Sequence, residues 1–201
     1  LYTGTITQAA GSSITLGTGG YTNPGGFTMY GGSFLGSSSG DAITVDELLL
    51  YGGSFTSTSG VLEVGFSAQW TTQIVAVHLS ATAVFNHNNG TFTFDSQGNS
   101  TGFRNHFDWD LDAELNLYNF NFDHEHNTLN NINGFNYNYG YVDIRGDSGR
   151  VNVANDLNIL NGSLLRGQIH FSGADVYFAC DAPGTRDICA SPSPFAPNDL
   201  G

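Results

Sequence analysis

Hydrophobic and polar residues alternate along much of this chain, most regularly between residues 103 and 145. From Phe103 to Leu117 the odd positions are mostly apolar and the even positions are mostly charged or polar. Because successive side chains of a β-strand point to opposite faces, this period of two predicts strands with one buried and one exposed face. The apolar residues then move to even positions at Phe120 and Phe122. One extra residue, at a β-bulge or a tight corner, would cause that change.

Turn residues separate the strand candidates in the rest of the chain. The segment 86–90 ends in Asn-Gly, a hairpin signal, because asparagine and glycine tolerate the left-handed backbone region. Local turns at a spacing of about 8–12 residues are typical of antiparallel sandwiches and jelly rolls. The sequence therefore predicts one all-β domain over residues 1–201, with an antiparallel β-sandwich or jelly-roll-like fold.

One internal repeat favours a different all-β fold. The segment YGGSF at 30–34 recurs at 51–55, and 51 − 30 gives a spacing of 21 residues. This spacing suits one coil of a β-solenoid, but such folds need at least three repeats to bury a core and only two clear copies are present. The β-solenoid is therefore the alternative fold, and two similar strand-turn units would also explain the repeat.

Composition indicates an extracellular protein. The chain has 18 acidic and five basic residues, no lysine and a net charge of −13, which disfavours nucleic acid and anionic membranes as partners. No run approaches the roughly 20 apolar residues of a membrane-spanning helix, so membrane insertion is not expected. The chain begins at Leu1 without an initiator methionine or a leader-like segment, so we expect a secretion signal to have been removed.

The C-terminal region contains both cysteines, Cys180 and Cys189, and most of the prolines. In an extracellular protein two cysteines this close predict a disulfide, rather than two free thiols or half of a metal site. Proline lacks the backbone N–H that a β-ladder needs, so residues 183–201 are expected to form an extended tail.

Two groups of residues are candidate metal ligands. Asp108, Asp110 and Asp112 follow one face of a predicted strand, about 6.6–6.8 Å apart, and carboxylate oxygens suit Ca²⁺. The segment does not fit an EF-hand loop, so a solvated acidic face with weakly bound calcium at most is the preferred interpretation. His124 and His126 share one face of a strand and would form half of a transition-metal site. We interpret them as a polar strand end, and expect no firmly held cofactor.

Three N-x-S/T sequons, at Asn89, Asn99 and Asn161, are candidate N-glycosylation sites if the source organism glycosylates its secreted proteins. No set of serine, histidine and aspartate, and no acid pair, stands out from the rest of the chain. The sequence therefore predicts that the protein is not an enzyme.

The N-terminal segment 1–10 is a candidate for strand exchange between subunits. It combines β-forming residues with a pliable Ala-Gly-Ser connector and contains no proline. An exchanged strand could complete the sheet of a neighbouring subunit, although it could equally pair within its own subunit. The residues expected to contact the neighbour are Leu1, Tyr2, Thr3, Thr5, Ile6 and Thr7.

These features together predict a secreted structural protein that binds copies of itself. We expect a subunit of an extracellular filament, pilus or surface matrix, such as a biofilm matrix, assembled through β-strand complementation. The alternative is an adhesion module at the cell surface that binds carbohydrate or calcium. Trp70, Trp109, the tyrosines of 137–141 and the acidic face would form its binding site.

Overall fold

All the strand pairs in the structure are parallel, which overturns the predicted antiparallel sandwich or jelly roll. The structure is a computed structural model that describes residues 1–17, 25–65, 74–97, 106–125, 141–147, 149–160, 165–166, 168–171 and 175–178. These residues form twenty strands in four sheets, here named A to D. The turns that indicated hairpins are instead corners between sheets.

Sheet A contains, in spatial order, β1 (Thr5–Thr7), β4 (Ser33–Leu35), β7 (Gly53–Thr56) and β10 (Ala83–Asn86). Sheet B contains β2 (Ile14–Leu16), β5 (Ile43–Val45), β8 (Val61–Val64), β11 (Thr91–Gln97), β14 (Asn119–Glu125), β17 (Asp156–Leu160) and β20 (Asp175–Phe178). Sheet C contains β3 (Gly26–Met29), β6 (Glu47–Leu50), β9 (Ile74–Leu79), β12 (His106–Leu111), β15 (Tyr141–Arg145) and β18 (Leu165–Arg166). Sheet D contains β13 (Leu115–Leu117), β16 (Arg150–Val153) and β19 (Gln168–Phe171).

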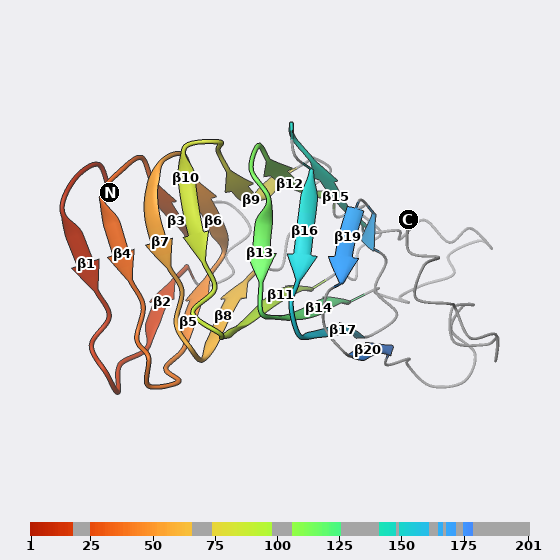
Figure 1. Cartoon of the computed structure of the whole chain (residues 1–201), viewed down its shortest axis with the longest axis horizontal. Helices are drawn as coiled ribbons and strands as arrows, with labels where there is room; N and C mark the ends of the chain where they lie inside the picture. Colours follow the sequence, from red (N-terminus) through yellow and green to blue (C-terminus); the bar gives the residue numbers. More distant parts are fainter. Residues whose placement is uncertain are drawn as a thin grey trace.

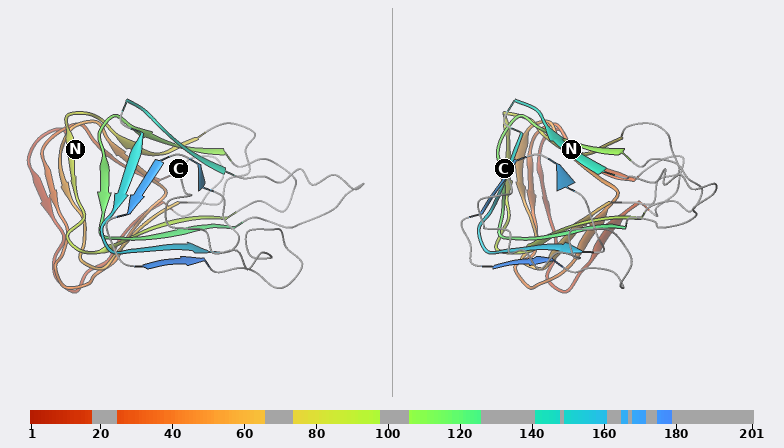
Figure 2. Two further views of the ribbon diagram at one scale, coloured as in Figure 1. Left: turned by 45° about the vertical axis from the view of Figure 1, so that its right-hand side comes forward. Right: turned by 90° about the vertical axis from the view of Figure 1, so that its right-hand side faces the viewer.

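The chain winds through these sheets in a solenoid-like arrangement. Within each sheet, neighbouring strands are three apart in chain order, so the chain visits three faces before it returns to the first. Sheets A and D lie in line on one face, with B and C forming the other two (Figures 1 and 2). A parallel pair requires a long crossover connection, and here the other two sides of each coil supply it.

In-register pairing stacks equivalent residues of successive coils inside the solenoid. The two YGGSF copies pair in this way, with Phe34 opposite Phe55, and their rings stack at 4.8 Å between centroids. Phe85 continues the stack at 5.8 Å from Phe55. The repeat thus marks β4 and β7, two neighbouring parallel strands of sheet A. Most of the phenylalanines of the described part pack in this core, because stacked aromatic rings fill a narrow interior well.

The alternation after residue 103 predicts the inner and outer faces of β12 correctly. Phe107, Trp109 and Leu111 are fully buried, whereas Asp108 and Asp110 lie on the outer face. The later change of parity comes from a corner: Leu117 ends β13 in sheet D and the chain turns at Tyr118 into β14 of sheet B. Both flanking strands keep their apolar side chains inside.

We expect Phe94→Ala to lower the free energy of unfolding by about 3–5 kcal/mol, because it leaves a cavity beside Phe107 and Phe122 in a fully buried stack. Val61→Ala is the matched control, since 40% of Val61 is exposed on β8 of the same sheet, and should cost less than about 1 kcal/mol. Urea-induced unfolding followed by circular dichroism measures both. Equal losses in the two variants would contradict the inward placement of Phe94.

Candidate functional site

The acidic residues of β12 pair with basic side chains from the neighbouring coils. Asp110 lies beside His78 of β9, with 3.1 Å between Asp110 Oδ2 and His78 Nδ1. The guanidinium of Arg145, on β15, donates a hydrogen bond to the buried carboxylate of Asp108. These two carboxylates therefore face cationic or proton-donating partners, which reduces the charge available to hold Ca²⁺.

The acidic residues that follow β12 are also engaged by the next coil. Arg150 Nη1 donates to Glu114 Oε1 at 3.0 Å, and Asn152 Nδ2 donates to Glu114 Oε2 at 2.9 Å. The backbone N–H of Asp147 donates to Asp112 Oδ1 at 3.4 Å. In the described ranges, no group of three or more metal-ligating side chains comes together.

The structure does not bring the two predicted groups of metal ligands onto one face. Asp108 and Asp110 belong to sheet C, whereas His124 belongs to β14 of sheet B, and His126 lies outside the described residues. A joint metal site would require residues from two different sheets of the coil to come together. β13 of sheet D lies between β12 and β14 along the chain, so two corners separate the two groups.

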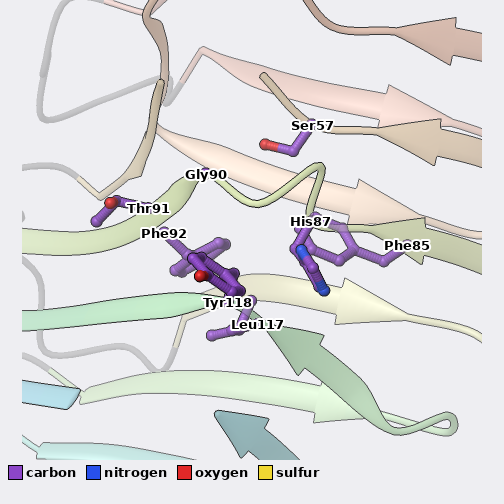
Figure 3. Close-up of a pocket in the computed structure, with 8 residues that line it drawn as sticks. All are labelled: Ser57, Phe85, His87, Gly90, Thr91, Phe92, Leu117 and Tyr118. Carbon is purple, nitrogen blue, oxygen red and sulfur yellow. The ribbon is translucent and has the colours of Figure 1, made fainter. Parts of the chain in front are cut away.

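A crevice opens where sheets A and D meet, between β10 and β13 (Figure 3). These two strands are not hydrogen-bonded neighbours, which leaves the gap. The crevice has no room for a water-sized molecule, so it does not have the dimensions of a small-molecule site. It is lined by Ser57, Phe85, His87, Gly90, Thr91, Phe92, Leu117 and Tyr118.

His87 is the one histidine that lines this crevice. Its ring stacks on Tyr118 at 5.7 Å, and its Nδ1 accepts a hydrogen bond of 2.9 Å from the backbone N–H of Asn89. Burial lowers the pKa of His87 below its ordinary value of 6.5, because the charged form loses hydration. Nδ1 of His87 is engaged in the turn, and no acidic side chain of the described residues is recorded on the ring, so the arrangement stabilises the corner.

The first coil leaves apolar core positions open at the end of the solenoid. Ile6 of β1 is 43% exposed although its register partner Phe34 is 1% exposed, and Leu16 of β2 is 37% exposed although its partner Val45 is 1% exposed. The inward side chains of β3 are covered, with Phe27 at 9%. In the described part of the chain, two of the three faces therefore end in strands whose core residues no further coil covers.

The segment predicted for strand exchange is paired within its own chain in the structure. Thr5, Ile6 and Thr7 pair in parallel with Ser33–Leu35 of β4. The adjoining Gln8 is 5% exposed, and its amide donates to Ser12 and Ala42 carbonyls while its oxygen accepts from Ser37 N–H. These contacts hold β1 against the second coil and leave its other edge without a strand among the described residues.

Sheet A and its two flanking corners form an uncharged face. The segments that build it, 1–8, 30–40, 51–60 and 80–90, contain no aspartate, glutamate, lysine or arginine. Its outward positions include the exposed apolar residues Leu35 and Val84, at 42% and 57%. In a chain of net charge −13, this segregation confines the charged side chains to the rest of the molecule.

Other predicted site residues are placed differently. Trp109 is fully buried, so it cannot form the carbohydrate-binding surface suggested from the sequence. Asn89 is exposed in the corner after β10 with a φ of 55°, a setting open to glycosylation. The remaining predicted residues lie outside the described residues: Cys180, Cys189, Asn99, Asn161, Trp70, Tyr137, Tyr139 and the tail 183–201.

Sequence reasoning missed the open first coil and the uncharged face. The signal for the face was present, because no charged side chain occurs before Asp41. No protein-family model, curated protein or solved structure matches this chain. Within the described ranges, no helix is long and apolar enough to cross a membrane.

We expect Ca²⁺ to bind with millimolar affinity at best, because Asp108 and Asp110 already face Arg145 and His78. Isothermal titration calorimetry of the protein and of Asp110→Asn measures this affinity. Micromolar binding that disappears in Asp110→Asn would contradict the paired arrangement.

We expect His87 to make the protein less stable as the pH falls below 6.5. Because the folded-state pKa is lowered, the unfolded chain binds a proton first, so the stability present above pH 6.5 is lost toward the folded-state pKa. His87→Phe keeps a ring against Tyr118 and does not titrate. The wild type should therefore lose more stability than this variant between about pH 8 and about pH 5. Parallel pH profiles of the two proteins would contradict the assignment.

Proposed function

We propose that this protein is a secreted structural subunit that assembles end to end through β-strand pairing into an extracellular filament or surface matrix. The observation that carries the proposal is the exposure of Ile6 and Leu16 at core positions of the first coil. Repeat proteins normally close their ends with polar capping units, because a bare end exposes the hydrophobic core. A second copy of the chain is an occupant that would cover this end with matching strands.

The strand order supports a head-to-tail contact. β1, β2 and β3 are edge strands of their sheets at one end, and β18, β19 and β20 are edge strands of sheets C, D and B at the other end of the described part. The last coil of one molecule and the first coil of the next would therefore continue all three faces in parallel. A head-to-tail contact of this kind does not close on itself and produces a filament.

The energies involved are adequate for association that depends on concentration. Each backbone hydrogen bond made by the edge strands would contribute about 0.5–1.5 kcal/mol. Covering the exposed parts of Ile6 and Leu16 would add on the order of 1 kcal/mol each. The first 40 residues carry no charged side chain, so the acidic character of the protein does not oppose contact at this end.

This mode differs from the exchange of an N-terminal strand in one respect. β1 stays paired with β4 and offers its free edge, rather than leaving its own subunit. Deleting residues 1–8 would simply move the open end to β4 and expose Phe34. A charge placed at the open core position is therefore the sharper test.

We expect Ile6→Asp to abolish end-to-end assembly, because it would place a carboxylate against apolar side chains in the contact. Val84→Asp is the matched control: it adds the same charge to sheet A, but on the outer face and away from the open end. Sedimentation velocity over a range of concentrations, with negative-stain microscopy, should show assemblies of the wild type and of Val84→Asp only. A wild type that stays monomeric at every soluble concentration, or folded Ile6→Asp that assembles equally, would overturn the proposal.

A further inference from the structure

Three tyrosines form an exposed stack along the corner between sheets C and A. The rings of Tyr2 and Tyr30 lie 4.9 Å apart at an interplanar angle of 13°, and those of Tyr30 and Tyr51 lie 5.0 Å apart at 10°. Their exposed fractions are 73%, 50% and 41%. Tyr51 also contacts the ring of His78, at 4.4 Å, which ends the row.

The backbone holds these rings in place. Tyr30 N–H donates to the carbonyl of Leu1 at 2.7 Å, and Tyr51 N–H donates to that of Met29 at 2.8 Å. The following glycines permit this close approach, since a Cβ on Gly31 would lie 2.5 Å from the carbonyl oxygen of Tyr2. The geometry of the stack therefore comes from coil spacing, not from the side chains alone.

The stack covers the faces of its central ring, while all three tyrosines stay partly exposed. Tyr30 has a neighbouring tyrosine on both faces, so a sugar ring could not lie on it, yet half of the residue is exposed to solvent. A stack whose only role was packing would not require a hydroxyl at each position. These features describe a set of phenols that is both accessible to an oxidant and already held in pairs.

We propose that Tyr2, Tyr30 and Tyr51 are an oxidative cross-linking site, at which a one-electron oxidant joins Tyr30 covalently to Tyr2 or to Tyr51. A haem peroxidase using hydrogen peroxide is the class of oxidant that would serve. Each of two neighbouring phenols loses one electron and one proton, and the two radicals form a carbon–carbon bond between ortho positions. The ring hydrogens at those carbons then move to the oxygens, which restores both phenols. The pair loses two hydrogen atoms in total, and one hydrogen peroxide is reduced to two waters.

The bond would fasten the open end of the solenoid. A bond from Tyr2 to Tyr30 links the first coil to the second, and a bond from Tyr30 to Tyr51 links the second to the third. β1 is exposed along its length and, in the described part, pairs with another strand on one edge only. A covalent link at Tyr2 would therefore restrain a strand that few other contacts hold. The covalent bond forms between tyrosines of one molecule and does not depend on filament assembly.

The test is oxidation of the folded protein at low concentration with a haem peroxidase and hydrogen peroxide. The readouts are dityrosine fluorescence, an intact mass lower by two hydrogens, and identification of the linked peptides after digestion. We expect linked peptides that join Tyr30 to Tyr2 or Tyr51. Because the rings are held together before reaction, their yield should fall roughly tenfold or more when the protein is oxidised in concentrated urea.

Tyr30→Phe keeps a ring in the stack but removes the central phenol, so it should abolish both linked products. Tyr118→Phe is the matched control, because Tyr118 stacks on His87 and not on a tyrosine of this site, and it should leave their yield unchanged. Linked peptides that never contain Tyr30, or a yield equally high in urea, would overturn the proposal. So would an absence of linked product under conditions that oxidise exposed tyrosines singly.

Discussion

In-register parallel pairing is the constraint on which the rest of the structure depends. It places equivalent residues of successive coils about 4.8 Å apart, so each choice of side chain is repeated along a row. Inside, the rows are aromatic stacks such as Phe34–Phe55–Phe85. Outside, Asn158 Nδ2 donates to Asn121 Oδ1 at 2.7 Å, and Asn121 Nδ2 donates to Thr93 Oγ1 at 3.3 Å. The same spacing thus organises the core, the surface and the tyrosine stack.

The rows also decide where charge is tolerated. Acidic side chains placed about 4.8 Å apart repel one another, and a basic residue in the same row relieves that repulsion. His78 and Arg145 are both register partners of Asp110, and the guanidinium of Arg145 also donates to the carboxylate of Asp108, whose own register partner is Asp143. With only five arginines in the chain, few rows can be balanced in this way, and the segments of sheet A carry no charge at all.

The sequence predicts the strands better than their arrangement. Period-two alternation correctly identified the inward face of β12, because that property is local to one strand, but it wrongly placed Asp108 in solvent: this carboxylate is buried beside Arg145 of the next coil. Pairing direction is not local: Asn88-Asn89-Gly90 suits a hairpin and a solenoid corner equally well, since both need positive φ. The repeat at 30–34 and 51–55 was the informative signal, yet later coils are lengthened by insertions and no longer resemble it. The exposure of Ile6 could not be predicted from the sequence, because it depends on which strand lies at the edge of sheet A.

The gap between β10 and β13 divides one face of the solenoid while sheets B and C run on without interruption. Backbone hydrogen bonds therefore transmit order along two faces but not across this gap. Local opening of sheet A, which consists of β1, β4, β7 and β10, need not propagate into sheet D, which consists of β13, β16 and β19. Bending toward or away from this face would change the spacing between sheets A and D without breaking a backbone hydrogen bond within either sheet.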